Sequence, residues 1–359
     1  MRSLIERSAV KKRHQRQPPA LISFVVWSYN HEPFLEKAIQ GAFAQTYEPL
    51  EVILSDDHSQ DRSYAIMEKM AAAYRGPHTV VLNRNPRNLG IAAHINRIVA
   101  LARGSIIFLA GGDDFSLPKR VEDCYKIYSK NSDVYGVWTN AALIDDQEKA
   151  IGFIGNNKDI YYSFQQHLSG IICRVVGCST SFRKEVFDRF GPLDPYLRVE
   201  DIPIHIRVLL FGKHFHLSKI LVRYRLHANN LSRIRQKEIN SWNKYVQKAL
   251  WLSNEHHQAH TKQHIRDAQR ALDLGIISHQ SFADFKIKAI SFKNQRILFN
   301  DFLTSKNRLT FYLLKIAWKR HFSIKEKLEC LLLIFGLPGA KLSIFIKQLF
   351  KRKKANYSS

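Results

Sequence analysis

The chain has 359 residues, of which 45% are hydrophobic, and a formal net charge of +24, so it is long enough for one α/β domain of about 200 to 250 residues and a smaller appendage. Residues 18–232 carry 24 Lys and Arg against 22 Asp and Glu, whereas residues 233–359 carry 25 against 8. The nearly neutral central part argues against a core that binds nucleic acid, and the basic end segment favours an anionic partner such as a membrane surface.

The beginning of the chain, residues 1–19, is basic and lacks the apolar core of a secretory signal, so we expect a flexible leader there. No apolar run reaches the roughly 18 residues that span a bilayer. The cysteines show neither CxxC pairing nor metal-finger spacing, which indicates buried thiols in a reducing compartment; they are Cys124, Cys173, Cys178 and Cys330. Together these observations predict a cytoplasmic protein.

Strands and helices alternate through the first third of the chain. Hydrophobic periodicity and β-branched runs predict strands at residues 21–27, 51–54, 79–82 and 105–110, separated by helices at residues 34–43, 64–74 and 91–102. Each strand ends in polar loop residues. This pattern is typical of a parallel, doubly wound sheet with its ligand site along the carboxyl edge.

Beyond Pro118 the alternation is less regular. The pattern predicts helices at 119–129, 164–168, 184–190 and 202–211, strands at 134–139 and 217–225, a polar segment through 158, and a strand or turn of small residues at 177–182. After residue 233 the composition becomes helical and basic, and the chain contains no internal repeat.

Two adjacent carboxylates, Asp113 and Asp114, follow the buried run 106–110 and the break at Gly111 and Gly112. Like charges this close raise each other's pKa unless a cation neutralises them. The pair therefore indicates either a divalent-metal site with oxygen ligands or a solvated turn, and Asp-Asp alone favours the turn.

Several motifs occur together in a fixed order: LISFVVWSYNHEPFLEKAIQGAFAQTYEPLEVILSDDHSQD, NPRNLGIAAHINRIVALARGSIIFLAGGDD, VEDIPIHIR and YRLHANNLS. Over residues 20–233 they resemble the inverting family-two glycosyltransferases of GT-A fold, a mostly parallel, doubly wound α/β fold found most often in bacterial surface-polysaccharide pathways. The resemblance implies one-step transfer of a sugar, with inversion, from a nucleotide-diphosphate donor, a UDP-sugar being favoured. The implied acceptor is a hydroxyl of a glycan or of a lipid-linked molecule.

The resemblance also implies a donor pocket. In the family, the acidic residue after the second strand reads the nucleotide base, and this position corresponds to Asp57, whose alternative role is to cap a helix or loop. The other donor-binding positions implied are Ser28, Tyr29, Asn30, Glu32, Asn88, Gly90, Asn96, Gly112 and Asp113.

A metal site is implied by the family's DxD motif. Asp113 matches its metal-binding position, Asp114 follows it, and Gly111 stands where the family has the first Asp. Mn²⁺ or Mg²⁺ would stabilise charge on the leaving nucleotide diphosphate. His227, in the late loop, is a further ligand candidate, although a lone histidine is more often structural.

The ED pair of the late helix corresponds to Glu200 and Asp201. Displacement at an anomeric carbon needs a base opposite the leaving group, and the resemblance assigns this role to Asp201, with Glu200 orienting the base or the acceptor. Helix capping by acidic residues is the alternative. The small residues Gly177, Cys178 and Ser179 would form the floor on which the acceptor rests.

Two other classes of protein remain as alternatives. A non-catalytic nucleotide-sugar-binding or scaffold protein of the same fold is made plausible by Gly111, although Asp113, Asp114 and Asp201 speak against it. A nucleotidyltransferase would normally carry a glycine-rich phosphate loop after the first strand, and residues 27–30 are not one.

The C-terminal region, residues 234–359, carries apolar residues at helical spacing and an excess of Lys and Arg. It is predicted to form helices, either as a subdomain packed on the sheet or as a membrane-surface element. Two short apolar segments, 328–337 and 342–350, precede the basic cluster 351–354. We favour peripheral association with an anionic membrane, on the inner face of the cell membrane.

Overall fold

The computed structural model describes residues 19–171, 175–227, 230 and 254–304. The expected leader, the two apolar segments between 328 and 350 and the basic cluster 351–354 lie outside the described residues. Within the described part of the chain, no helix is both long enough and apolar enough to cross a bilayer.

The first third of the chain forms a parallel four-stranded unit in the order β3-β2-β1-β4. Its elements agree with the predicted ones to within one or two residues: β1 (Ile22–Ser28), α1 (Leu35–Phe43), β2 (Leu50–Asp56), α2 (Ser63–Ala73), β3 (Thr79–Arg84), α3 (Ile91–Leu101) and β4 (Ile106–Gly111). Helix α1 buries Leu35, Ala38, Ile39 and Ala42, the i, i+3, i+4, i+7 spacing of one helix face.

The second half contributes β5 (Phe115–Ser116), α4 (Arg120–Lys130), β6 (Val134–Ile144), β7 (Ala150–Ile154), β8 (Ile160–Tyr162), α5 (Phe164–Leu168), the 3₁₀ turn η1 (Gly177–Ser179), β9 (Ser181–Arg183), α6 (Glu185–Phe190), α7 (Asp201–Phe211) and β10 (Lys213–Arg225). Two longer helices follow: α9 (Asn254–Asp273) and α10 (His279–Thr304). Strands β7 and β8 lie in the segment expected to be a polar loop, and β10 begins four residues earlier than predicted.

The complete sheet has the order β3-β2-β1-β4-β9-β6-β10-β5, with β7 beside β6 and β8 beside β10. The α/β fold class is confirmed, but pairing in the second half is mixed. Strand β9 runs antiparallel to both β4 and β6, whereas β10 runs parallel to β6. Strand β9 pairs with strands that end far before it in the chain, at Gly111 and Ile144, so the local alternation of residues could not predict its direction.

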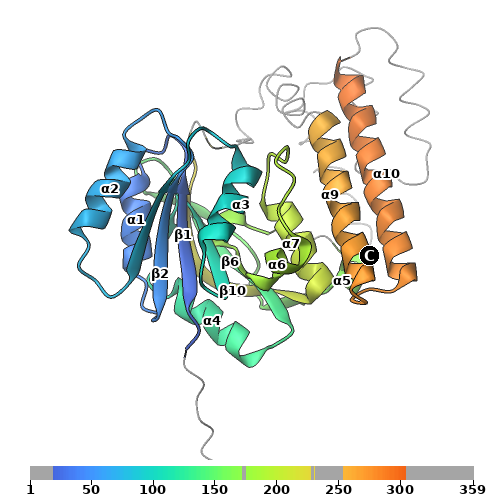
Figure 1. Ribbon diagram of the computed structural model, residues 1–359, viewed down its shortest axis with the longest axis horizontal. Helices are drawn as coiled ribbons and strands as arrows, with labels where there is room; N and C mark the ends of the chain where they lie inside the picture. The colour runs from blue at the N-terminus through green and yellow to red at the C-terminus, as the bar shows by residue number, and fades with distance from the viewer. Residues whose placement is uncertain (1–18, 172–174, 228–229, 231–253, 305–359) are drawn as a thin grey trace, which may run out of the picture.

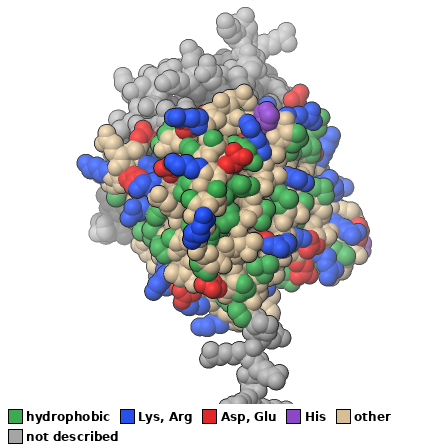
Figure 2. Space-filling model, turned by 60° about the vertical axis from the view of Figure 1, so that its left-hand side comes forward, with side chains coloured by type: hydrophobic (Ala, Val, Ile, Leu, Met, Phe, Trp, Pro, Cys, Tyr) green, Lys and Arg blue, Asp and Glu red, His purple; other side chains and the backbone are tan. Residues whose placement is uncertain are grey.

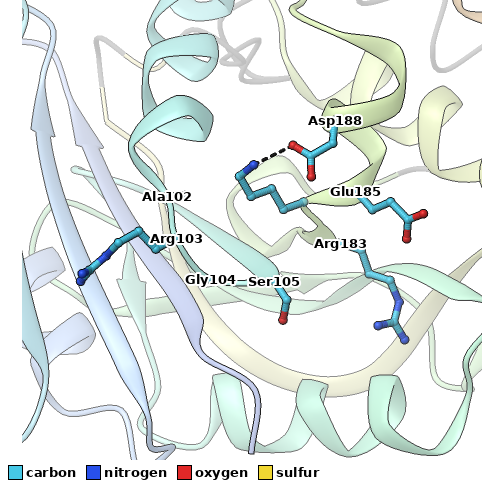
Figure 3. A pocket seen from close by; sticks show the side chains of 8 residues that line it. Ala102, Arg103, Gly104, Ser105, Arg183, Glu185 and Asp188 are labelled. Carbon is cyan, nitrogen blue, oxygen red and sulfur yellow. Dashed lines mark hydrogen bonds and ion pairs between the residues drawn. The ribbon is translucent and has the colours of Figure 1, made fainter.

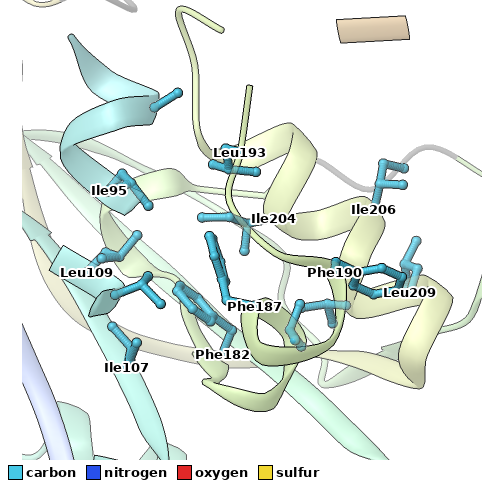
Figure 4. Packing of buried hydrophobic residues seen from close by; sticks show 14 of the residues in the cluster. Ile95, Ile107, Leu109, Phe182, Phe187, Phe190, Leu193, Ile204, Ile206 and Leu209 are labelled. Carbon is cyan, nitrogen blue, oxygen red and sulfur yellow. The ribbon is translucent and has the colours of Figure 1, made fainter. Parts of the chain in front are cut away.

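Hydrophobic residues fill both faces of the sheet, because successive side chains of a strand point to opposite sides. In β1, Val25 belongs to the core under α3, α6 and α7, while Phe24 and Val26 belong to the core under α1 and α4. Figure 4 shows the first of these cores, in which Phe182 of β9 and Phe187 of α6 lie against residues of β4 and α7.

Helix α9 is part of the same core. Its Ala259, Ala268 and Ala271 are buried together with Phe285 of α10, and the helix lies beside α7 in Figure 1. Arg207 of α7 and Asp267 of α9 form a fully buried ion pair with an Nε–Oδ2 distance of 2.9 Å. The two helices described after residue 233, α9 and α10, therefore pack on the sheet domain, which corresponds to one of the two predicted alternatives for this region.

Charge on the described surface is mixed in sign. On the face shown in Figure 2, Lys and Arg side chains lie among Asp and Glu side chains and do not gather into one basic patch. This agrees with the nearly neutral count for residues 18–232.

Candidate active site

The carboxyl ends of β1, β2 and β4 form one continuous polar edge. The Asp57 amide donates to the Ser28 carbonyl at 2.9 Å, and the Gly112 amide donates to the Trp27 carbonyl at 2.9 Å. A Cβ added to Gly112 would lie 3.1 Å from the Cβ of Ser28. Ser28 is therefore packed between the loop that follows β2 and the loop that follows β4, as expected for a parallel sheet edge.

The loops after β1 and β2 are joined to each other. Asn30, at φ 56°, accepts from the Gln60 amide, and its own amide donates to Ser59 Oγ. Both carboxylate oxygens of Glu32 accept from Arg62, at 2.7 Å from Nε and 2.9 Å from the amide. Asn30 and Glu32 thus hold the two loops together, and the ring of Tyr29 between them is 39% exposed.

Asp57 is buried and organises the next loop. Its Oδ1 accepts from Asn85 Nδ2 at 2.8 Å and from the Leu89 amide at 2.9 Å, and its Oδ2 accepts from the Gly90 amide at 3.0 Å. Gly90 adopts φ +78°, a conformation that favours glycine, and its amide also donates to Asn88 Oδ1. These bonds fit the predicted loop-capping role of Asp57. Since Oδ2 accepts one of the three, it can still accept a second hydrogen bond, which the predicted base-reading role requires.

Asn96 lies elsewhere. Its amide group donates to the Leu193 carbonyl at 2.8 Å and accepts from the Leu193 amide at 2.7 Å. We therefore assign Asn96 a structural role, in place of the donor contact expected from its position in the sequence. It fastens α3 to the segment that leads toward Glu200.

Asp113 contacts two imidazoles. Its Oδ2 lies 3.0 Å from His227 Nε2 and 3.9 Å from His31 Nε2. Burial alone would raise the pKa of Asp113, but the hydrogen bond from His227 and the charge of His31 outweigh burial, and the pKa lies below its usual value. Asp113 is therefore an ionised carboxylate beside imidazole nitrogen.

His31 was not singled out from the sequence. Its Nδ1 is buried without a hydrogen-bond partner, and a Cβ on Gly112 would approach it to 2.8 Å. The sequence around His31 is a polar turn and does not indicate a contact with Asp113. The parallel pairing of β1 with β4 brings the two residues together.

Asp114 faces the interior and corrects the expectation of a second metal ligand. It is 5% exposed, its Oδ1 accepts from the Arg225 amide at 3.0 Å, and its carboxyl group is hydrogen-bonded to Cys178. Burial, and then the charge of Asp113, raise the pKa of Asp114 well above its usual range. A neutral, enclosed carboxyl group is a poor cation ligand.

Gly111 has a steric reason. A Cβ at this position would lie 2.6 Å from Asp113 Oδ1. An aspartate at position 111 would therefore displace the Asp113 carboxylate from the position in which it meets His227.

The catalytic candidates Glu200 and Asp201 lie at the start of α7. Burial, and then the charge of Asp201, raise the pKa of Glu200 to about 8, and burial raises the pKa of Asp201. With a pKa of about 8, Glu200 keeps its proton at neutral pH. A protonated carboxyl group beside a second carboxyl group can donate a hydrogen bond while the second acts as a base.

The turn η1 lies between the two acidic sites. A Cβ on Gly177 would lie 3.2 Å from Glu200 Oε1 and 3.7 Å from Asp201 Oδ2, while the neighbouring Cys178 is hydrogen-bonded to Asp114. Burial and the Asp114 carboxyl group raise the pKa of the Cys178 thiol. Two consecutive positions, Gly177 and Cys178, therefore connect the Asp201 side with the Asp114 side.

Ser179 does not fit the predicted acceptor floor. It is fully buried, its hydroxyl donates toward the Thr139 and Val176 carbonyls at 2.9 Å, and it accepts from the Thr139 amide at 3.1 Å. Ser179 fastens η1 to β6, so the open side of η1 next to the carboxyl pair is formed by Gly177.

The residues present fit a divalent cation only in part. Among the described residues there is no cluster of three or more His, Cys, Asp and Glu side chains arranged to hold a metal ion. Asp113 and His227 supply one carboxylate oxygen and one imidazole nitrogen, which suits Mn²⁺ or a Mg²⁺ ion whose other ligands are phosphate oxygens and water.

A separate polar depression lies at the opposite, amino edge of the sheet (Figure 3). It is lined by residues 102–105 and by Arg183, Lys184, Glu185 and Asp188. Lys184 pairs with Asp188 at 2.6 Å, and Arg103 pairs with Glu51 at 2.8 Å. Because these charges are paired and the depression lies at the edge opposite the carboxyl ends of the strands, we do not include the depression in the candidate active site.

Comparisons with known proteins agree with this geometry. The model of Glycosyl transferase family 2 matches residues 23–191. An uncharacterized glycosyltransferase of Methanocaldococcus jannaschii is 26% identical over 246 residues, covering 66% of this chain and 81% of that protein. UDP-Glc:alpha-D-GlcNAc-diphosphoundecaprenol beta-1,3-glucosyltransferase of Escherichia coli is 23% identical over 223 residues, covering 61% of this chain and 82% of the relative.

Among solved structures, TarS 1–349 of S. aureus in complex with UDP is similar with a TM-score of 0.52 at 13% identity, over 86% of this chain and 77% of that one. This likeness is one of fold. Taken with the family match over residues 23–191 and the related glycosyltransferases, it supports a glycosyltransferase that contains a family 2 domain of GT-A fold and uses a nucleotide-sugar donor.

Proposed function

We propose that this glycosyltransferase transfers a sugar from a UDP-sugar to a hydroxyl of a glycan or lipid-linked acceptor, with inversion at the anomeric carbon. The observation that carries the proposal is the geometry around η1: a Cβ on Gly177 would lie 3.2 Å from Glu200 Oε1 and 3.7 Å from Asp201 Oδ2, and the neighbouring Cys178 is hydrogen-bonded to Asp114, which follows Asp113 in the chain. The name of the Escherichia coli relative, which pairs a UDP-linked glucose with a diphosphoundecaprenol acceptor, supports the donor and the acceptor class.

In this mechanism Asp201 takes the proton of the acceptor hydroxyl as the new bond forms. Burial raises the pKa of Asp201, so its carboxylate is a stronger base than that of an exposed aspartate. Glu200, still protonated, donates a hydrogen bond that orients the acceptor. Gly177 leaves room for the acceptor beside both carboxyl groups.

The donor binds along the carboxyl edge of β1, β2 and β4. Tyr29 packs on the base, and Asp57 Oδ2 accepts a second hydrogen bond, from the imide N–H of uracil. A divalent cation, held by Asp113 and His227, would offset negative charge on the leaving diphosphate. His31, whose Nε2 lies 3.9 Å from Asp113 Oδ2, donates a hydrogen bond to a diphosphate oxygen.

Metal removal tests this assignment. In the presence of a UDP-sugar and an acceptor mixture, EDTA should stop release of UDP, and added Mn²⁺ or Mg²⁺ should restore it, because the leaving diphosphate then has a counterion. UDP release is measured by a coupled assay, with a panel of GDP- and TDP-sugars as donor controls.

Full activity in EDTA would remove Asp113 from the ligand list. Donor binding without any release of nucleotide, whatever acceptor is offered, would favour the non-catalytic alternative over a transferase.

For the C-terminal region we propose association with an anionic membrane surface from the cytoplasmic side. A chain ended at residue 320 should pellet with vesicles containing phosphatidylglycerol several-fold less than the full chain, because each basic residue near such a surface contributes about 1 kcal/mol. Equal pelleting of the two chains would show that residues beyond 320 are not the attachment. Vesicles of neutral phosphatidylcholine are the control.

A further inference from the structure

We propose that Gln263 of α9 is a positioning residue for the Glu200–Asp201 pair. It acts through the segment of residues 191–200, which connects α6 to α7 and ends at the catalytic carboxyl groups. The inference rests on the proposed function in one respect, since it takes Asp201 to be the base. It concerns a helix that lies beyond the part of the chain matched by the family model.

Gln263 holds the segment directly. Its Oε1 accepts from the Asp194 amide at 2.7 Å, and its Nε2 donates to both oxygens of Asp267 at 2.8 Å. The side chain is 1% exposed, so both ends of the amide are used within the protein. A buried backbone N–H needs such a partner, and here α9 supplies it.

Asp267 connects Gln263 to the beginning of the segment, at Gly191, through Arg207. It is bonded by Nε and Nη2 of Arg207 at 2.9 and 3.1 Å, and Nη1 of the same guanidinium donates to the Gly191 carbonyl at 2.7 Å. Since Arg207 is on α7, one buried network joins α9, the start of the segment and the helix that begins with Asp201.

Two further contacts from α9 fix the rest of the segment. Arg266 donates to the Pro192 carbonyl at 2.8 Å, and His256 Nδ1 accepts from the Arg198 amide at 3.2 Å. On the other side, Asn96 of α3 holds Leu193 by two hydrogen bonds. The segment is therefore clasped between α3 and α9, and its last turn before Glu200 is fixed from α9.

The donor side does not share these contacts. The loops around Asp57 and Asp113 are held by β1 to β4 and by Arg225, with no bond from α9 among the described residues. Loss of the Gln263 contact should therefore shift the base without shifting the nucleotide. A displacement of about 1 Å in a reacting group can lower turnover about 10²-fold.

The test compares two variants of the full chain. Gln263→Met keeps the volume of the side chain but removes its hydrogen bonds with Asp194, Asp267 and Arg266. Gln269→Met is the control, because the side chain of Gln269, on the same helix, donates to the exposed Asp273. We expect Gln263→Met to lower kcat about 10- to 100-fold, to leave the dissociation constant of UDP within twofold, and to speed hydrogen–deuterium exchange in residues 192–200. The control should change none of these.

Unchanged exchange in residues 192–200 would overturn the inference, as would faster exchange with unchanged kcat. A loss of UDP binding that parallels a lower melting temperature would also overturn it, since Gln263 would then maintain the fold. The outcome stays distinct from failure of the proposed function: if Asp201 is not the base, Asp201→Asn keeps its turnover while the exchange result for Gln263→Met still stands.

Discussion

Replacing Asp201 by asparagine should lower turnover by about 10²- to 10⁴-fold, the usual contribution of a general base. Asparagine has nearly the same shape but cannot take the proton of the acceptor hydroxyl. The dissociation constant of UDP should stay within about twofold, because the donor site that we propose lies along β1, β2 and β4 and does not include Asp201. Initial rates of glycan formation and calorimetric titration with UDP measure the two quantities.

The matched control is Asp188→Asn. Asp188 is an exposed aspartate on α6 that pairs with Lys184 at 2.6 Å, so its replacement should change turnover little. If Asp201→Asn turns over at close to the rate of the unaltered enzyme, Asp201 is not the base.

Acidification from pH 7 to pH 5 should weaken the packing of α9 on the sheet domain. Buried and half-buried imidazoles line this contact. His256 of α9, His205 of α7 and His214 of β10 are buried, and His260 and His264 of α9 and His167 of α5 are half-buried. The rings of His260 and His264 are 4.4 Å apart, and the Nδ1 atoms of His205 and His214 are 2.7 Å apart. Other charges near this contact are Arg207 with Asp267, Lys288 beside His167 and Arg198 beside His256.

Burial lowers the pKa of these groups: to about 3 for His205 and His264, to about 4 for His256, and well below 6.5 for His214 and His260. The unfolded chain takes up protons near pH 6.5, whereas the folded chain does not until the pH is much lower. The stabilisation is therefore fully present above pH 6.5 and is lost as the pH falls toward the folded values. Each such histidine lowers the free energy of unfolding by up to about 1.4 kcal/mol for every pH unit below 6.5. Two such histidines would therefore remove a large share of a typical free energy of unfolding over two pH units.

Melting temperature measured from pH 8 to pH 5 checks this directly. A His260→Gln, His264→Gln double variant should show a flatter dependence below pH 6.5, and His279→Gln, at an exposed position, should behave as the unaltered chain does. A melting temperature that stays constant between pH 7 and pH 5 would contradict the prediction.

Much of the nucleotide half could be predicted because local pattern and tertiary position agree there. Every strand of residues 20–111 is an apolar run that ends in polar residues, and parallel pairing brings those ends together. The pairing of Asp113 with His227, which are 114 residues apart, followed from the family resemblance. No periodicity in the residues could have joined them.

Three of the expected site residues have structural partners that the sequence could not show. Asp114, Asn96 and Ser179 bond backbone groups distant in sequence, and Asp114 also bonds Cys178, so their types alone could not separate a structural role from a binding role. The burial of α9 did have a signal, the spacing of His256, His260 and His264 on one helix face. Histidine was not counted as a core residue, although a neutral imidazole can be one.

The clasp on residues 191–200 also bears on the order in which the enzyme becomes competent during its synthesis. The nucleotide half ends near residue 114, and Gln263 leaves the ribosome about 150 residues later, at about 5 to 20 residues per second. A chain that ends before α9 would lack the hydrogen bonds of Gln263, Arg266 and His256 with residues 192–198, and would keep those of Asn96 and Arg207.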